Sequence, residues 1–192
     1  MRQVEAKTLS NLEVHPFLLK KWTYAFKTFF DINGNGSLEY KDFDTLAHII
    51  RATRGPRSHE YISAKLAFPE IWYSLTQAAQ IDEGGKLNLD DWISLLTKNR
   101  NGKWQKSYLD YMYNLFDASG DRLVDQAEYV QVMSYFSIDR DTANRAFDQF
   151  AVSSDGTLLM AIDWKQFNQL WQDFFSSTDI HARGNYLLGC VQ

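Results

Sequence analysis

The chain has 192 residues and a net charge of −4, and 45% of its residues are apolar. A chain of this length can bury a substantial core, and its acidic balance without a basic stripe argues against nucleic acid as a partner. No stretch approaches the apolar length that a membrane-spanning helix needs, and the N-terminal residues show no apolar secretory run. Cys190 is the single cysteine, so no internal disulfide can form. We therefore expect a monomeric, cytoplasmic protein that is not inserted in a membrane.

Segments of helical periodicity alternate along the chain with short clusters of Asp, Asn, Gly and Ser. Pro16 suits a first helical turn, and Ser58 is a candidate N-cap. The polar stretch Asn99–Ser107 is the candidate linker between an N-terminal half, residues 1–100, and a C-terminal half, residues 101–192. The periodicity predicts helices over residues 16–30, 40–52, 58–79, 89–98, 104–116, 126–136, 139–151 and 163–175.

Four windows between these helices share one pattern of apolar positions. The windows are Asp31–Asp42, Gln80–Asp91, Asp117–Glu128 and Asp155–Gln166. Their eighth residues are all aliphatic: Leu38, Leu87, Val124 and Ile162. The residues that follow them are all aromatic: Phe43, Trp92, Tyr129 and Phe167. Apolar residues also recur three positions later and five positions before each window: Leu46, Leu95, Val132 and Leu170, and Phe26, Leu75, Met112 and Phe150. The agreement predicts an all-α fold of four helix–loop–helix EF-hands in two pairs, with the eighth residues of paired loops joined by short β-bridges.

The first window has the oxygen ligands of a calcium loop. Such a loop presents oxygens at positions 1, 3, 5, 7, 9 and 12 and turns sharply at a glycine in position 6, here Gly36. Position 12 is Asp42, whose shorter side chain reaches an ion less easily with both oxygens than the usual glutamate does, and this favours Mg²⁺ in competition with Ca²⁺. Glu39 stands at position 9. The expected ligands are Asp31, Asn33, Asn35, the carbonyl of Ser37, and Asp42.

The third window has the fuller set of acidic residues, with Asp125 at position 9. Its expected ligands are Asp117, Ser119, Asp121, the carbonyl of Leu123, and Glu128. Arg122 occupies the glycine position, where a left-handed backbone costs about 1 kcal/mol. That cost is small beside the binding energy of the carboxylates, so we expect Ca²⁺ here.

The second and fourth windows are poorer in ligands. The second begins with Gln80 and has Gly84 at position 5, so we expect no metal in Gln80–Asp91 at physiological concentrations. The fourth has Leu159 at position 5 and Gln166 at position 12, so we expect a structural hand that binds nothing. An ordinary Asx-rich turn would explain one such cluster, but it would not explain the shared apolar frame.

The motifs resemble those of the invertebrate sarcoplasmic calcium-binding proteins, and among them the calexcitin group, over nearly the whole chain. The resemblance is carried by Phe29-Phe30-Asp31 with Asn33, Gly36 and Asp42-Phe43, by Asp117-x-Ser119-Gly120-Asp121 with Val124-Asp125 and Glu128-Tyr129, and by Gly184-Asn185-x-Leu187-x-Gly189. It implies a compact helical protein with a silent fourth hand, acting in calcium buffering in muscle or calcium signalling in neurons. The second loop, normally intact in that family, departs from the pattern.

Three functions remain open from the sequence. The tail Ile180–Gln192 either frays or folds Ile180, Tyr186, Leu187 and Leu188 into the cleft between the hands. A plugged cleft would indicate a calcium buffer, whereas an open one would indicate a sensor that offers an apolar groove to an unknown protein target. A third candidate is a photoprotein-like or coelenterazine-binding protein, with six Trp and four His lining a cavity.

No catalytic constellation is apparent. The histidines His15, His48, His59 and His181 have no metal-ligand spacing with one another or with Cys190, and the chain contains no phosphate-binding loop or nucleophile elbow. We therefore expect a binding protein rather than an enzyme.

Overall fold

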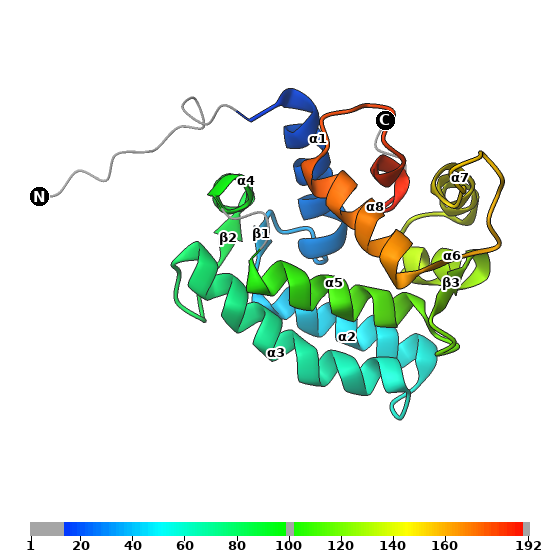
Figure 1. The fold of residues 1–192 in the computed structure, drawn as a ribbon. Helices are drawn as coiled ribbons and strands as arrows, with labels where there is room; N and C mark the ends of the chain where they lie inside the picture. Colours follow the sequence, from blue (N-terminus) through cyan, green and yellow to red (C-terminus); the bar gives the residue numbers. More distant parts are fainter. Residues whose placement is uncertain (1–13, 99–101, 190–192) are drawn as a thin grey trace, which may run out of the picture.

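The computed structural model describes residues 14–98 and 102–189. These residues form eight α-helices and four short strands, with one strand between the two helices of each helix–loop–helix unit (Figure 1). The α-helices are α1 (Pro16–Ala25), α2 (Tyr40–Arg54), α3 (His59–Ala79), α4 (Leu89–Lys98), α5 (Lys103–Phe116), α6 (Gln126–Tyr135), α7 (Arg140–Phe150) and α8 (Trp164–Ser176). The strands are β1 (Ser37–Leu38), β2 (Leu87–Asn88), β3 (Leu123–Asp125) and β4 (Ala161–Asp163). The π-helix η2 (Phe26–Phe30) continues α1, and the 3₁₀ helix η3 (Arg183–Tyr186) follows α8. The all-α expectation and its helix positions are confirmed.

Local capping explains most helix boundaries. Pro16 begins α1, and the Ser58 hydroxyl accepts a hydrogen bond from the Tyr61 N–H at the start of α3, as expected. The expected linker is too long, because Lys103 begins α5. The N–H of Gly102 donates to the Gln105 side chain there and closes the first turn. Residues 99–101 of that stretch lie outside the described residues.

The entering helix of the first hand ends in a π-turn. The N–H of Asp31 donates to the carbonyl of Phe26 at 2.8 Å, so the last turn is one residue wider than an α-turn. Phe26, Phe29 and Phe30 belong to this π-helix and are all buried, each at most 2% exposed. The π-turn therefore places three aromatic rings in the core immediately before the first loop.

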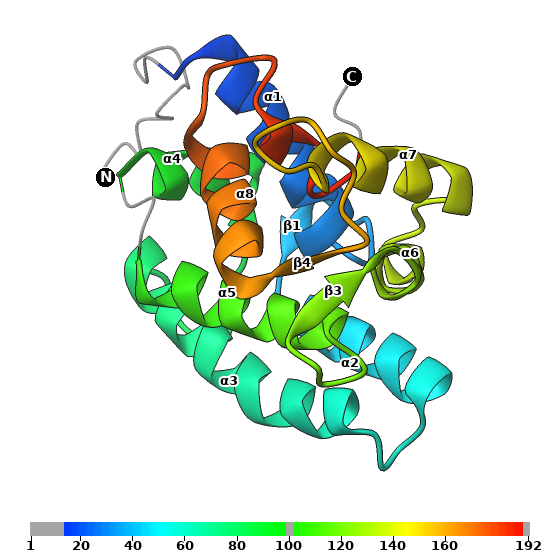
Figure 2. The ribbon, with the colours of Figure 1, turned by 45° about the vertical axis from the view of Figure 1, so that its right-hand side comes forward.

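The predicted β-bridges pair the loops. β1 and β2 are antiparallel with Leu38 opposite Leu87, and β3 and β4 are antiparallel with Val124 opposite Ile162. All four aliphatic side chains are at most 1% exposed. The first loop is thus joined to the second and the third to the fourth, as Figure 2 shows for β3 and β4.

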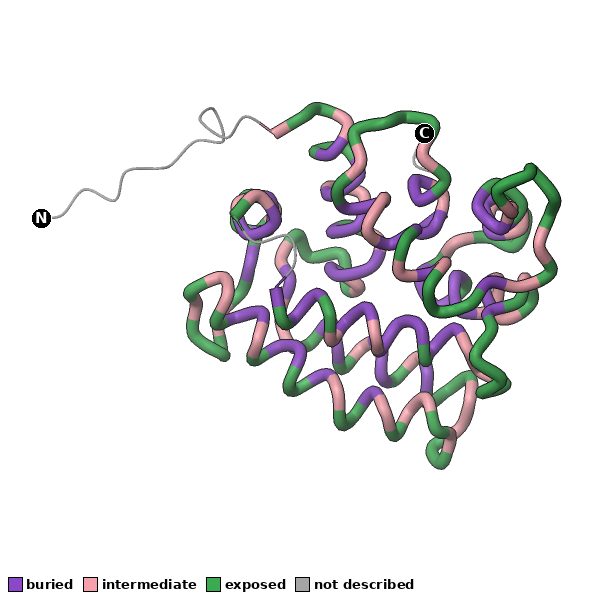
Figure 3. The backbone as a smooth tube through the Cα atoms, viewed as in Figure 1, coloured by how far each residue is buried: buried purple, intermediate pink, exposed green. Residues whose placement is uncertain are grey.

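One core runs through both halves of the chain. Phe30 lies 4.4 Å from Trp92 and 4.7 Å from Tyr108 between ring centroids, and Trp92 lies 5.5 Å from Trp104. These rings come from η2, α4 and α5, and α5 also packs along α3 (Figure 1). Figure 3 accordingly shows buried segments on helices of both halves of the chain. The division at residue 100 remains a prediction. None of the described helices has the length and apolar content to cross a bilayer.

The chain segment after α8 folds back against the hands. Leu187 and Leu188 are at most 1% exposed, and their carbonyls accept hydrogen bonds from Tyr129 at 2.9 Å and Tyr24 at 2.7 Å. Tyr186 packs partly buried against the core, so these three placements are confirmed. Ile180 is 61% exposed, contrary to expectation, because the polar turn that contains it runs over the surface before η3 begins. Residues 190–192 lie outside the described part.

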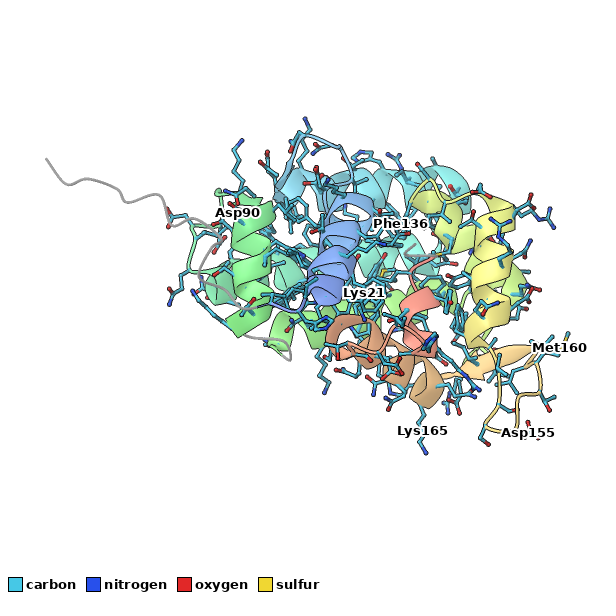
Figure 4. All side chains as sticks on the ribbon, turned by 90° about the horizontal axis from the view of Figure 1, so that it is seen from above. Lys21, Asp90, Phe136, Asp155, Met160 and Lys165 are labelled. Atoms are coloured by element: carbon cyan, nitrogen blue, oxygen red, sulfur yellow. The ribbon has the colours of Figure 1, made fainter. Side chains whose placement is uncertain are left out.

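Lys21 holds this returning segment in place. Its ammonium donates to the carbonyls of Asp173 at 3.1 Å and Ser177 at 2.8 Å, and to the side-chain oxygen of Asn185 at 2.9 Å. The whole residue is 0% exposed, in the centre of the molecule seen from above (Figure 4). One cation therefore satisfies the C-terminal carbonyls of α8 and ties them to α1 and to η3.

Burial lowers the pKa of Lys21 to about 8, with the carboxylate of Asp173 opposing the shift. Between that pKa and the ordinary value of 10.5 the unfolded chain holds a proton that the folded chain has released, so stability rises with pH in this window. From about pH 7.5 to 9.5, the unfolding free energy of the wild type should rise by roughly 1–2 kcal/mol relative to Lys21→Met. Urea denaturation at both pH values measures this difference. Exposed Lys20→Met is the control, and parallel profiles for Lys21→Met and the wild type would refute the assignment.

Candidate metal centres

The first and third loops hold their position-1 carboxylates in the same way. Asp31 accepts the N–H of Gly36 at 2.8 Å, and Asp117 accepts the N–H of Arg122 at 3.1 Å. Gly36 has φ +83° and Arg122 has φ +69°, so both position-6 residues take the left-handed turn that the sequence predicts. In both loops the turn aims a backbone N–H at the first ligand residue and fixes that carboxylate over the loop.

The position-12 carboxylates also match. One oxygen of Asp42 accepts a backbone N–H from position 3 at 3.0 Å, and the other accepts one from position 9 at 2.8 Å. The two oxygens of Glu128 likewise accept backbone N–H groups from positions 3 and 9, at 2.8 Å and 3.1 Å. The donors are Asn33 and Glu39 in the first loop, and Ser119 and Asp125 in the third. Each acid thereby closes its loop back onto itself, with lone pairs remaining for a cation.

The ligand residues at position 5 also make the same hydrogen bond in both loops. The side-chain oxygens of Asn35 and Asp121, both at position 5, accept N–H groups from position 7 at 2.9 Å, namely those of Ser37 and Leu123. The structure thus brings together all ten predicted site residues, in two loops of equivalent geometry. Carboxylate, amide, hydroxyl and carbonyl oxygens are the donors that Ca²⁺ and Mg²⁺ take, so the residues fit such an ion.

The electrostatics of the first loop favour a cation. Asp31 and Asp42 are only 5% and 1% exposed. Burial raises the pKa of Asp42, the N–H groups of Glu39 and Asn33 act against this, and the carboxylates of Asp31 and Glu39 raise the pKa further. Two buried acids in one loop repel each other, and a bound cation would relieve that repulsion.

The second loop departs from this geometry at its start. Gln80, at position 1, has φ +58° and ψ 42°, whereas Asp31 and Asp117 have φ near −75° and ψ near 70°. Asn88 and Asp91 still exchange the reciprocal hydrogen bonds of positions 9 and 12, at 3.1 Å and 3.0 Å. The loop therefore keeps the cap of its exit helix but not the entry that carries the first ligand.

The fourth loop begins earlier than the sequence frame predicts. Helix α7 ends at Phe150, and Ala151 has φ −80° and ψ 65°, the conformation of Asp31 and Asp117 at position 1. Asp155 is therefore not the first loop position. The extra residues form a small projection closed by a bridge between Val152 and Leu158 (Figure 4).

Hydrogen bonds between polar groups at the surface hold this projection together. Asp155 accepts from the hydroxyl of Ser153 and from the N–H of Thr157, and these bonds lower its pKa to about 2. Met160, which follows the projection, is 89% exposed. Asp163 and Gln166 cap α8 as positions 9 and 12. With alanine at its first position, the fourth loop lacks the ligands of the first and third.

Two features of the site were missed by sequence reasoning. The first is the added length of the fourth loop, for which the polar Ser153–Thr157 cluster inside the expected window is the only signal. The second is a contact between the side chains of Lys86 and Glu39, which only the pairing of β1 with β2 brings together. Within residues 14–98 and 102–189, no three His, Cys, Asp or Glu side chains converge on one point as a metal-binding group, so the ligand sets of the two loops rest on amide, hydroxyl and carbonyl oxygens as well as on carboxylates. All four histidines are exposed.

Paired helix–loop–helix units with bridged loops, capped exit helices and oxygen-lined turns define the EF-hand class of calcium-binding proteins. Calexcitin-1 of Caenorhabditis elegans is 32% identical over 182 residues, covering 93% of this chain and 89% of the relative. The beta chain of a sarcoplasmic calcium-binding protein from Penaeus is 25% identical, covering 86% and 92%. The chain belongs to the family of calexcitin and the sarcoplasmic calcium-binding proteins.

Solved structures agree on the fold. The sarcoplasmic calcium-binding protein of amphioxus superposes with a TM-score of 0.75 at 17% identity, covering 91% of this chain and 97% of that one. The photoprotein mitrocomin from the jellyfish Mitrocoma cellularia gives a TM-score of 0.62 at 16% identity, covering 90% and 91%. No family model matches the chain.

The left-handed Arg122 offers a test of the third loop. Arg122→Gly should raise the unfolding free energy by up to about 1 kcal/mol, because glycine has no Cβ to strain at positive φ. Arg122→Ala removes the same charge but keeps the Cβ, so it should give no such gain. Urea denaturation of both variants separates the two effects, and equal gains would assign the effect to charge rather than to the backbone.

Proposed function

We propose that the chain is a cytoplasmic calcium buffer that binds Ca²⁺ in Asp31–Asp42 and in Asp117–Glu128, with Mg²⁺ competing chiefly in the first loop. The observation that carries the proposal is the hydrogen-bond network shared by these two loops, which orients the acids of positions 1 and 12. A preorganised ligand set lowers the ordering cost of binding. The calcium-binding relatives support the same conclusion.

In each of these two loops, two acids supply the first and the last carboxylate ligand. Asp31 and Asp117 supply the first carboxylate, and Asp42 and Glu128 supply the last from the first turn of α2 and α6. Glu128 carries one methylene more than Asp42 and reaches further across its loop. The first loop is therefore the one in which the smaller ion, Mg²⁺, competes.

The burial of the tail residues Leu187 and Leu188 favours a calcium buffer over a calcium sensor. Tyr129 follows Glu128 directly, and its hydroxyl donates to the carbonyl of Leu187 while the third loop already has its ligand geometry. A ligand-ready loop and a plugged cleft thus coexist in one conformation. Binding that leaves the plug in place would offer no apolar groove to a target.

The photoprotein-like alternative finds little support in the core. Five of the six tryptophans are at most 4% exposed and serve as packing residues. The pocket lined by Phe29, Phe30, Phe43 and Tyr108 holds about 10 Å³, room for a water molecule at most. A fused-ring ligand would need a far larger enclosed chamber. A larger pocket, of about 410 Å³, is lined by Trp164, Trp171 and Phe175, but Trp164 is 37% exposed there, so that pocket is open to solvent.

Calorimetric titration of the metal-free chain with Ca²⁺ tests the proposal. Two sites are expected, and millimolar Mg²⁺ should weaken only the one in Asp31–Asp42. Glu128→Gln removes a charged ligand and should weaken the other site more than about tenfold while sparing the first. The matched change Gln166→Glu, at position 12 of the fourth loop, should create no third site. Absence of binding heat and of bound ion would overturn the proposal.

The buffer role has its own test. If the tail stays seated, fluorescence of an apolar dye such as ANS should change little when saturating Ca²⁺ is added. Tyr129→Phe removes the hydroxyl that donates to the tail, and it should raise dye binding in both the metal-free and the loaded state. A large increase for the wild type with Ca²⁺ alone would instead indicate a sensor.

A further inference from the structure

The silent second loop places a cation beside the first loop. The ammonium of Lys86 lies 3.3 Å from a carboxylate oxygen of Glu39, and the Asn35 amide donates to the same oxygen at 3.2 Å. Glu39 occupies position 9 of the first loop and precedes the first residue of α2. Asn35 is one of the proposed ligands. A positive charge from one hand therefore touches the ligand shell of the other.

Strand register accounts for this contact. Ser37 lies opposite Asn88 and Leu38 opposite Leu87, so the next antiparallel pair along the ladder is Glu39 with Lys86. Side chains of directly opposed residues lie within contact distance in such a pair. The bridge that joins the two loops thus determines which residue of the silent loop meets position 9.

The other pair of hands lacks the cation. Asp125, at position 9 of the third loop, lies opposite Ala161. Ala161 and Lys86 both directly precede the aliphatic bridge residue of their silent loop, Ile162 and Leu87. The two ligand-bearing loops therefore differ by one positive charge at an equivalent position of the partner loop.

We propose that Lys86 sets the cation affinity of the first loop, by holding Glu39 in an ion pair and by repelling a divalent ion in Asp31–Asp42; this inference rests on the proposed function. A unit charge about 10 Å from a divalent ion in water, partly screened by salt, changes the affinity for that ion by about threefold. The third loop faces the uncharged Ala161 at the equivalent position of its partner loop.

The role is electrostatic rather than structural. The Lys86 side chain is 65% exposed and that of Glu39 is 27% exposed, and surface ion pairs of this kind contribute little to stability. Substitution of Lys86 should therefore leave the fold intact. The charge acts on the ion through space, so its effect should fall as salt is added.

The test is a Ca²⁺ titration of the full chain followed by two-dimensional NMR. The Gly36 and Arg122 amides donate to Asp31 and Asp117, so they report on the two loops separately. Lys86→Ala should bind Ca²⁺ in the first loop about threefold more tightly at low salt and leave the third loop unchanged. The gain should disappear toward 1 M NaCl.

Reciprocal and matched variants complete the design. Ala161→Lys should weaken the third loop by a similar factor, and Lys86→Arg, which keeps the charge, should behave as the wild type does. Lys65→Ala, which removes a charge on α3 roughly 20 Å before its loop end, should alter neither loop.

The outcomes separate the two proposals. If Gly36 never responds to Ca²⁺ in any variant, the proposed function fails at the first loop. If Gly36 responds with equal affinity in the wild type and Lys86→Ala, the role of Lys86 is refuted while the proposed function stands. A salt-independent gain in Lys86→Ala would also refute it, because the effect would then be structural.

Discussion

The antiparallel bridge between paired loops is the constraint on which the rest of this structure depends. Leu38 with Leu87, and Val124 with Ile162, are buried at the centre of each pair and fix the two loops relative to each other. A single hand exposes its apolar face and cannot stand alone, so a loop without ligands is still needed as a partner. The second and fourth hands therefore have a structural role as packing partners of the first and third.

The same bridge also determines which charged side chains of one hand lie beside the loop of the other. The register of each bridge determines which residue of the second or fourth loop lies opposite position 9 of the first or third loop. In one pair this residue is Lys86 and in the other it is Ala161. The side chain at this surface position differs between the two pairs, and a change of side chain there hardly affects folding.

The residue at position 12 joins the first and third loops to the helices that follow them. Asp42 and Glu128 close their loops from the first turn of α2 and α6, and Tyr129 continues from Glu128 to the carbonyl of the returning tail. At the far ends of those helices, Arg54 donates to the hydroxyl of Tyr135 at 2.8 Å. The exit helices of the first and third hands are thus in contact.

The sequence by itself determined the helix–loop–helix repeat, the buried apolar frame, the two loops richest in oxygen ligands and the left-handed turn at Arg122. These features arise from neighbours a few residues apart, where periodicity, capping and ligand spacing act directly. Only the tertiary structure decided that the fourth loop begins at Ala151 rather than at Asp155, that Ile180 stays outside while Leu187 is buried, and that Lys21 binds the end of α8. It also decided that Lys86 meets Glu39. Those outcomes depend on which distant segments compete for the same cleft or face each other across a bridge, and local sequence carries no record of such partners.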